Sequence, residues 1–529
     1  MVNTFSMKNR NNNFAALRGL YAKAFLYLPF ALVTTCFAQS GPYPITRYGA
    51  LPDGKTDNTL AIQKAINTAA ENGGGTVLIP AGQFVTGVIN LKSNINLHFE
   101  NGAALLATTN RADYGPQKAS ALIVATDAQH IAITGKGTID GRGDDLLKDI
   151  YRMLRAGTLK DDEWQTYNDW HQMRPAESNR PHLIDFIKCS DVTIKNITIK
   201  NGLCWIQDYR SCQDMVIDSI TVVSNTFLNN DGIDLVDCKN VKLSNSFFNV
   251  ADDGICLKSS DPNGACENID ISHCRIRSSA SAFKMGTASF GGFKKIKVRD
   301  IEVYDTFRSA IAIETVDGGL IEDIDIRNVT ARNTGNAIFI RLGQRNKKAA
   351  PGILRRVYIG QVKAQVPAGK PDKGYPMDGP EVRFKHHVFP SSIAGIPGHQ
   401  VEDVTLEDID ITYEGTSKTD YTKYNFDNLA NIPEAISDYP EFSMFGELPA
   451  WGFYARHANG VTLKNIKLSY LKNDLRTACI FDDVNKLNID GIRINKMQSK
   501  PTVVISNSTT PTVKRITVAG KTDKQILIK

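Results

Sequence analysis

A short phrase of alternating apolar and polar residues recurs along most of this chain and constrains its fold more than any other feature. One copy reads Asp191-Val-Thr-Ile-Lys-Asn-Ile-Thr-Ile199, and the next reads Asp214-Met-Val-Ile-Asp-Ser-Ile-Thr-Val222. Further copies begin at Asn240, Asn268, Lys295, Asp323, Asp403, Gly460 and Lys486. Neighbouring copies between Asp191 and Asp323 are 23 to 28 residues apart, and their period-two alternation is typical of short β-strands with one buried face.

The fourth position of each copy is a large aliphatic residue. These residues are Ile194, Ile217, Leu243, Ile271, Val298, Ile326, Leu406, Leu463 and Ile489. One short strand cannot bury its apolar face alone, whereas equivalent strands stacked from successive coils bury a continuous column and pair their backbones. We therefore predict an all-β fold, a single-stranded right-handed parallel β-helix formed by residues 39–529. The leucine-rich-repeat frame and the period of about 40 residues typical of propeller blades are both absent from the sequence.

The ends and interruptions of this solenoid are also visible in the sequence. An open solenoid exposes a strand edge, so it needs a cap. Between Asp57 and Asn72, apolar residues at i, i+3, i+4 and i+7 predict a helix that covers the N-terminal opening. The stretches near 142–180 and 341–400 are too long for turns between coils. We expect both to project as loops, which commonly shape a binding groove on a rigid scaffold.

Residues 1–38 carry the pattern of a cleaved secretory signal. A basic start is followed by the apolar run Ala24–Val33 and then by Cys36-Phe-Ala38, whose third residue is small. The apolar run is too short to cross a bilayer, which takes about 20 residues. The sequence thus predicts an exported protein, periplasmic or extracellular, that is not inserted in a membrane after cleavage.

Charge and cysteine content narrow the range of partners. The formal net charge of +6 is mild and scattered, which argues against nucleic acid as a partner. The eight cysteines after Cys36 contain no Cys-x-x-Cys pair, and we expect them to behave as small buried apolar residues. An oxidising compartment would nevertheless permit a disulfide between Cys256 and Cys266. We expect a monomer that needs no cofactor and no metal and binds a polysaccharide.

The residues most suggestive of chemistry are aspartates on two consecutive copies of the repeat. Asn229-Asn-Asp231-Gly-Ile-Asp234 is followed, 21 residues after Asp231, by the pair Asp252 and Asp253. Since that distance is close to one coil, the three should lie on adjacent rungs, a few ångströms apart. Clustered carboxyls raise one another's pKa, so one can act as an acid while another activates water. A calcium site and aspartates that cap turns remain open as alternatives.

Several motifs resemble glycoside hydrolase family 28, the polygalacturonase and rhamnogalacturonan hydrolase family. They are Tyr48-Gly-Ala-Leu-Pro-Asp-Gly-Lys-Thr-Asp-Asn58, Gly73-Gly-Gly-Thr-Val-Leu-Ile-Pro80, Gly135-Lys-Gly-Thr-Ile-Asp-Gly141 and the spaced aspartates. The first two also occur in other β-helix proteins, whereas the aspartate spacing is more specific. The resemblance covers nearly the whole chain after residue 38.

The resemblance implies a role for each aspartate. Asp252 would be the general acid, and Asp231 and Asp253 would position and deprotonate the attacking water, so that anomeric configuration inverts. Asn229 and Lys258 match family positions that line the site, where a cation can steady a carboxylate or bind a sugar oxygen. A solvated lysine at a strand end is the alternative for Lys258.

Two family motifs are replaced in this chain. Gly-His-Gly corresponds to Ala280-Ser281-Ala282, and Arg-Ile-Lys corresponds to Ala312-Ile313-Glu314. The basic pair of the second motif reads a galacturonate carboxylate, which Glu314 would repel. We therefore expect rhamnogalacturonan, or a substituted or terminal linkage, rather than smooth homogalacturonan. Glu314 would accept hydrogen bonds from sugar hydroxyls, or else pair with Lys284 or Arg308.

Further candidate substrate contacts are four basic residues, two of which stand in an aromatic segment. They are Lys284, Arg341, Arg456 and His457, the last two in the segment Pro449-Ala-Trp451-Gly-Phe-Tyr454-Ala-Arg456-His457, which follows Tyr439–Gly446. Sugars stack on aromatic rings, and an arginine can hold an acidic sugar with two hydrogen bonds. Aromatic residues that merely pack in a turn are the alternative.

Two other functions remain open from the sequence. A polysaccharide lyase or epimerase also uses β-helices, but it needs a base to remove a sugar C5 proton, a step that the three aspartates suit less well. A non-catalytic carbohydrate-binding β-helix would use the aspartates for folding alone.

Overall fold

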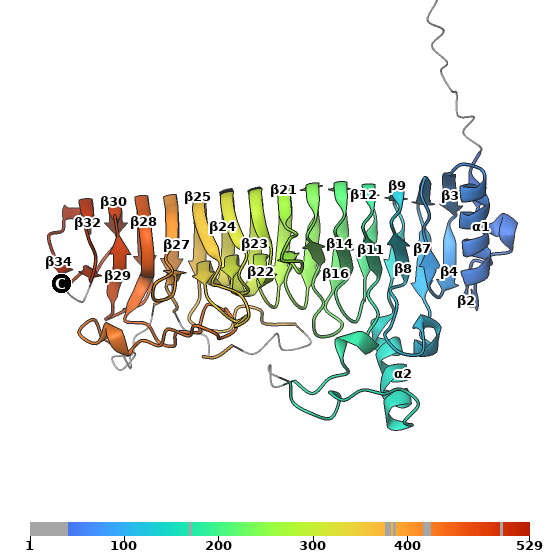
Figure 1. Ribbon diagram of the computed structural model, residues 1–529, viewed down its shortest axis with the longest axis horizontal. Coiled ribbons are helices and arrows are strands. Elements are labelled where there is room, and N and C mark those ends of the chain that lie inside the picture. Colours follow the sequence, from blue (N-terminus) through green and yellow to red (C-terminus); the bar gives the residue numbers. More distant parts are fainter. Residues whose placement is uncertain (1–40, 169–171, 376–381, 385–387, 416–424, 498–500) are drawn as a thin grey trace, which may run out of the picture. The chain divides into compact units, whose positions relative to one another are not determined.

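The computed structural model describes residues 41–168, 172–375, 382–384, 388–415, 425–497 and 501–529. The predicted signal, residues 1–38, lies outside these residues. The described residues belong to one compact unit. This unit is a right-handed parallel β-helix, as the repeats predicted. Its strands lie side by side in successive coils from β3 to β34 (Figure 1). None of the described helices is long and apolar enough to cross a bilayer.

Each regular coil contributes one strand to each of three parallel columns. The first column contains β1 (Tyr43–Pro44), β3 (Gly75–Ile79), β6 (Ile95–Phe99), β9 (Gln129–Gly135), β12 (Ser190–Lys195), β15 (Gln213–Asp218), β18 (Lys239–Ser244), β30 (Asn488–Ile494) and β32 (Thr512–Val518). The second contains β2 (Asp53–Asp57), β4 (Gly82–Thr86), β7 (Ala103–Ala107), β10 (Thr138–Asp140), β13 (Thr198–Lys200), β16 (Thr221–Ser224) and β19 (Phe247–Val250).

The third column carries the strands on which the candidate site is built. It contains β5 (Ile89–Asn90), β8 (Ile123–Thr126), β11 (Ile184–Ile187), β14 (Gln207–Arg210), β17 (Ile233–Val236), β20 (Ile255–Ser259), β22 (Phe283–Ser289), β26 (Ser391–Ala394), β29 (Thr477–Asn485), β31 (Val503–Ser506) and β34 (Ile526–Ile528). Longer strands, which bend through more than one column, are β21 (Cys266–Ser278), β23 (Gly292–Thr315), β24 (Leu320–Leu342), β25 (Ile353–Val366), β27 (Val401–Tyr413) and β28 (Ala450–Tyr470). The short β33 (Lys521–Thr522) pairs antiparallel with β32.

The residue that opens each repeat explains why the phrase recurs. All nine have a positive φ, from 49° at Lys486 to 78° at Gly460. Asparagine, aspartate and glycine tolerate this left-handed conformation best, and they occupy seven of the nine positions. Side chains at these turns also form hydrogen bonds from coil to coil. The Asn268 amide donates to Asn240 Oδ1, and the Asn240 amide donates to Asp214 Oδ1. The phrase thus encodes a corner followed by a strand.

The predicted aliphatic column is confirmed by the strand register. Ile194 pairs with Ile217, Ile217 pairs with Leu243, and the pairing continues from coil to coil through Ile489. All of these residues are buried. One member was missed: Ile359 of β25 stands between Ile326 and Leu406. The expectation that 341–400 forms one loop is therefore wrong, because this stretch contributes two strands, β25 and β26.

Two helices accompany the strands. Helix α1 (Thr59–Glu71) buries Ile62, Ala65, Ile66 and Ala69, which have the i, i+3, i+4 and i+7 spacing that predicted the helix, and it contacts β1, β3, β5 and β6. It lies at the blue end of the strand stack in Figure 1, and its importance as a cap stays a prediction. Helix α2 (Gly143–Arg155) lies in the first predicted insertion, which is thus partly helical. Short 3-10 turns span Ile45–Tyr48, Arg111–Tyr114, Glu177–Asn179 and Leu429–Asn431.

The eight cysteines of the described residues are all buried and free. Four of them occupy equivalent positions on successive coils: Cys189, Cys212 and Cys238 directly precede β12, β15 and β18, and Cys266 is the first residue of β21. The thiols of the last three donate to backbone carbonyls of the preceding coil. The expectation of small buried residues is confirmed, and Cys256 and Cys266 form no disulfide in this structure.

Candidate active site

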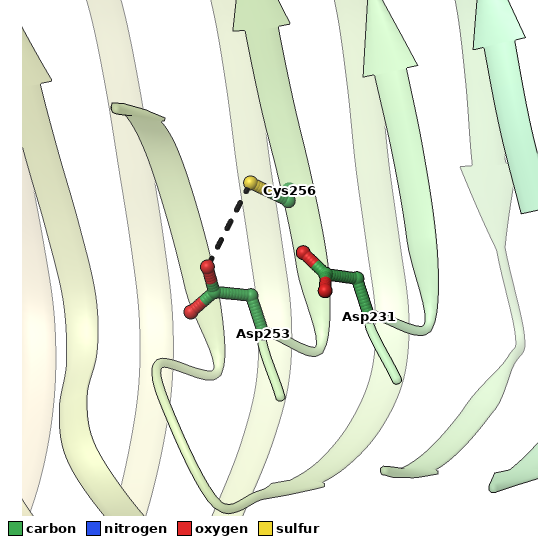
Figure 2. A group of neighbouring side chains, drawn as sticks. All are labelled: Asp231, Asp253 and Cys256. Carbon is green, nitrogen blue, oxygen red and sulfur yellow. Dashed lines mark hydrogen bonds between the residues drawn. The ribbon is translucent and has the colours of Figure 1, made fainter. Parts of the chain in front are cut away.

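The three aspartates singled out in the sequence lie just before two paired strands, β17 and β20. Ile233 of β17 pairs with Ile255 of β20, so Asp231 and Asp253, each two residues earlier, occupy equivalent places on neighbouring coils. Their nearest carboxylate oxygens lie within 4.8 Å of each other, and Figure 2 shows both side chains pointing to the same side. Asp252 adjoins them, and its Oδ1 accepts a hydrogen bond of 2.9 Å from the Asp253 amide. The predicted adjacency is therefore confirmed.

These neighbouring carboxyls have opposite protonation tendencies. Burial and the charge of Asp253 raise the pKa of Asp252 to about 6. Burial would also raise the pKa of Asp253, but Lys284, 2.9 Å from its Oδ2, and Lys258 lower it below its ordinary value. Burial and the charge of Asp234 raise the pKa of Asp231 well above its ordinary value, although Lys258 opposes them. In mildly acidic solution the cluster therefore holds both protonated and ionised carboxyls.

Lys258 is fully engaged with the protein. Its ammonium contacts Asp234, lies 3.2 Å from Asp231 Oδ2 and 3.1 Å from Cys256 Sγ, and sits 4.4 Å from the centroid of the Trp205 ring. Its exposed fraction is 8%. The reading as a solvated lysine is therefore wrong. Of the two roles considered for a cation here, the geometry supports steadying a carboxylate rather than binding a sugar oxygen.

Lys284 of β22 lies one coil further and is in register with Cys256. Its ammonium donates to Asp253 Oδ2 and to the Tyr439 hydroxyl, both at 2.9 Å. Arg308 is buried nearby, with its guanidinium 5.5 Å from the centroid of the Tyr439 ring. Tyr439 reaches the site from a loop more than 150 residues away in sequence, which closes the cluster on that side.

Asp231, Asp252 and Asp253 line a cleft of about 200 Å³. The described residues that line it are Gln172, Glu177, Trp205, Asn229, Asp231, Asp252, Asp253, Lys258, Lys284, Thr287, Arg345 and Tyr439. Asn229 thus lies where it was predicted, and its Oδ1 accepts from Arg180 at 2.9 Å. Sequence reasoning missed Gln172, Glu177, Trp205, Thr287 and Arg345. Only Tyr439 had a signal, as part of an aromatic segment.

Three predicted substrate contacts instead anchor a loop. Arg341 is 1% exposed, and its guanidinium donates to the backbone carbonyls of Gly395, Glu434 and Ala435. Arg456 and His457 bind the Glu434 carboxylate at 2.8 and 3.0 Å. None of the three lines the cleft, because they lie on later coils and their polar groups face this loop. The prediction is corrected for all three, and Trp451 and Tyr454 of the same segment are buried.

Glu314 also lies away from the cleft. It is 2% exposed, and its Oε2 has no hydrogen-bond partner among the described residues. Burial raises the pKa of Glu314 to about 8, although Lys284 and Arg308 oppose this. The expected pairing with Lys284 or Arg308 is not formed as an ion pair within the described chain. A direct contact between Glu314 and a bound sugar does not fit this position.

The same cluster contains the candidate metal ligands. Asp231, Asp253 and Cys256 have ligand atoms within 4.8 Å of one another (Figure 2). The ammonium groups of Lys258 and Lys284 contact these three residues directly, and they supply the positive charge that a cation would bring. The donor set is thus neutralised by the protein itself.

Fold and cleft together define a β-helix protein whose cleft brings an acidic and an ionised carboxyl side by side. Comparison with known families gives the particular group. The family model described as glycosyl hydrolases family 28 matches residues 71–370, so the chain belongs to this family and is a glycoside hydrolase.

Individual relatives are identical to this chain at about a quarter of the aligned positions. The chain is 26% identical to a probable polygalacturonase of Vitis vinifera, with 65% of this chain and 72% of the relative covered. It is also 26% identical to an exopolygalacturonase of Zea mays, over 57% of this chain and 69% of that protein. A crystal structure of a hyperthermoactive exopolygalacturonase from Thermotoga maritima shares the fold, with a TM-score of 0.54 and 22% identity over 71% of this chain and 87% of that one.

Proposed function

We propose that this glycoside hydrolase cleaves pectic polysaccharide with inversion at the anomeric carbon. Asp252 protonates the oxygen of the leaving sugar. Asp253, ionised and held by Lys284, takes a proton from the attacking water, while Asp231 holds that water in place. The polygalacturonase names of the plant relatives support the pectic substrate.

The observation that carries this proposal is the contrast between two consecutive carboxyls. Asp252 has a pKa of about 6, whereas Asp253 keeps its charge because an ammonium group lies 2.9 Å away. An acid and a base with separated pKa values are what glycoside hydrolysis requires. The approach of Asp231 to within 4.8 Å of Asp253 suits two groups that flank one water molecule.

We further propose a preference for rhamnogalacturonan, or for a substituted or terminal linkage, over smooth homogalacturonan. Each cation that lines the cleft already has a carboxylate partner: Lys258 with Asp231 and Asp234, Lys284 with Asp253, and Arg345 with Asp317. A second galacturonate carboxylate beside the cleaved bond would therefore meet little uncompensated positive charge. Ala312 and Glu314 add none at the positions of the family's basic pair.

Replacing Asp252 with asparagine tests the catalytic assignment. We expect kcat on rhamnogalacturonan backbone to fall by about 10²–10⁴-fold, the usual contribution of a general acid, with an unchanged melting temperature. Asp237→Asn is the matched control, since Asp237 is a buried aspartate directly after β17 that binds Ser259 and the amides of Ser260 and Asp261. Retained turnover in Asp252→Asn would refute the assignment.

Product analysis separates the substrate preference from the rival functions. Incubation with rhamnogalacturonan backbone and with polygalacturonate, followed by sizing, should give faster release from the first. NMR of the fresh product should show the inverted anomer. An unsaturated product that absorbs ultraviolet light would indicate a lyase, and binding without turnover would indicate a non-catalytic β-helix.

We also propose that the mature protein is an exported monomer, after removal of residues 1–38. Amino-terminal sequencing of protein recovered outside the cytoplasm tests the cleavage, and light scattering tests the monomer. Retention of the first 38 residues would count against export by a cleaved signal.

A further inference from the structure

The outward face of the third column changes along the solenoid. In each strand, alternate residues belong to the main core, and the residues between them point outward. Upstream of the aspartates, the outward residues Val124, Asp185 and Arg210 are partly exposed to solvent. Downstream, the row that starts at Lys284 continues through residues that are at most 2% exposed. They are Ala312, Phe339, Ser392, Tyr454, Ile480 and Val504.

A second apolar cluster, separate from the main core, covers this downstream face. Residues 429–448, which we call the cover (orange in Figure 1), supply Leu429, Ile432, Phe442, Met444, Phe445 and Leu448 to it. Phe339, Tyr454 and Ile480 of the buried row belong to the same cluster. The strands of the third column thus carry a core on both faces downstream of Lys284.

Charged groups fix the cover to the coils beneath it. The Glu434 carboxylate of the cover lies 2.8 Å from the Arg456 guanidinium and 3.0 Å from His457 Nε2. The other ring nitrogen of His457 lies 2.7 Å from Asp483. Both basic side chains are mostly buried, so water screens these contacts little. The cover is therefore a fixed part of the fold.

The cover begins directly beside the catalytic centre. Its residue Tyr439 lines the cleft, and the Tyr439 hydroxyl accepts a hydrogen bond of 2.9 Å from Lys284. The same ammonium donates to Asp253. Along this row, the surface available to a polymer therefore ends one coil after the aspartates.

We propose that the protein attacks the end of a polysaccharide chain, because the cover leaves the third column open on one side of the aspartates only. This inference rests on the proposed hydrolysis and names the part of the polymer that is cleaved. An internal linkage needs room for the chain on both sides of the aspartates. Sugars further downstream would have to displace the buried rings of Phe442 and Phe445, and exposing such apolar surface to water is unfavourable. A chain end needs room there for a short leaving unit alone.

Product sizes early in the reaction of the native protein test the inference. The substrate is rhamnogalacturonan backbone or polygalacturonate, whichever is hydrolysed. We expect short products together with polymer of nearly full length, and little loss of viscosity. If the polymer is first shortened by partial acid hydrolysis, the initial rate at equal, subsaturating mass should rise in proportion to the concentration of chain ends. Products of intermediate length from the start, with a rapid loss of viscosity, would overturn the inference.

Glu434→Ala tests the part played by the cover. Loss of this carboxylate leaves Arg456 and His457 without a partner on the cover, so amide exchange across 429–448 should rise by about 10-fold or more. Products of intermediate length should then appear, because the downstream face opens. Unchanged exchange, or unchanged product sizes, would overturn the role given to the cover.

Glu322→Ala is the matched control. Glu322 also binds two basic side chains, Arg355 and Arg356, but it stands in the first column, away from the cover. Its replacement should leave both the exchange of the cover and the product sizes unchanged. A shift of product sizes in this variant as well would show that general loosening of the solenoid, and not the cover, sets them.

The failure of this inference is distinct from a failure of the proposed function. If the native protein hydrolyses neither polymer, or if Asp252→Asn retains turnover, the proposed function itself fails. If Asp252→Asn is inactive and the native protein releases products of intermediate length from the start, the hydrolysis stands and only attack at the chain end is refuted.

Discussion

At the scale of single residues, partners rather than sequence position decide what each aspartate can do. Asp252 and Asp253 are neighbours in the chain and are both buried, yet only Asp253 has an ammonium group at 2.9 Å. That contact outweighs burial and keeps Asp253 ionised, whereas Asp252 retains a proton up to about pH 6. One ion pair thus converts two like groups into a base and an acid.

This contrast predicts a bell-shaped dependence of kcat on pH. Activity should rise as Asp253 ionises, below the ordinary range of an aspartate, and fall as Asp252 loses its proton at about pH 6. In Lys284→Met the pKa of Asp253 should rise, so the acidic limb should move to higher pH. Steady-state kinetics across the profile measure both limbs. An acidic limb that stays in place in Lys284→Met would contradict the assigned base.

Arg341 and Arg345 offer a second comparison, between a buried anchor and a residue of the cleft. Arg341→Met should lower the melting temperature, because each buried carbonyl left without its donor costs about 1–3 kcal/mol, and KM should stay unchanged. Arg345→Met should raise KM, since Arg345 lines the cleft, and it should also lower the melting temperature, because it leaves the buried carboxylate of Asp317 without its ion-pair partner. A reversal of the two KM effects would restore Arg341 as a substrate contact.

At the scale of elements, the sequence was most informative where the repeat is regular. Corner residues such as Asp214 and Asn240 predicted strands that the register confirms. The copy in β25 was missed because Arg356 stands at its corner and Gly360 follows its core residue, so it looked like part of a loop. The loops carry no such periodicity, and nothing in the sequence placed Arg345 or Gln172 at the cleft.

The helix at the N-terminal end allows a test of capping. Ile66 of α1 is fully buried, so Ile66→Ala should destabilise the first coils by about 2–5 kcal/mol and expose a strand edge to association. Leu60, in the same helix, is 85% exposed, and Leu60→Ala is the control. Thermal unfolding and light scattering measure the two effects. If the two variants have the same thermal stability and the same tendency to associate, α1 does not act as a cap.

At the scale of the whole solenoid, the residues of the site come from parts of the chain that are separated by very different distances in sequence. Asp231 and Asp253 come from consecutive coils, so sequence spacing could predict their approach. Gln172 comes from a segment well before these two residues in sequence, and Tyr439 comes from one far after them. Their approach depends on how loops pack against the rigid stack. Short-range periodicity therefore predicted the catalytic centre and left the walls of the cleft undetermined.

Because each coil contacts only its neighbours, a core defect should act locally along the axis. Ile217 is fully buried in β15, one coil before the coil that begins at Asp231, whereas Ile516 lies in β32, near the C-terminal end. Ile217→Ala should increase amide exchange around β14 to β20 and reduce kcat, since a loosened coil misplaces Asp231. Ile516→Ala should increase exchange only in the last coils and leave kcat unchanged. If both variants lose activity equally, the solenoid unfolds as one cooperative unit, and the local account of the site is wrong.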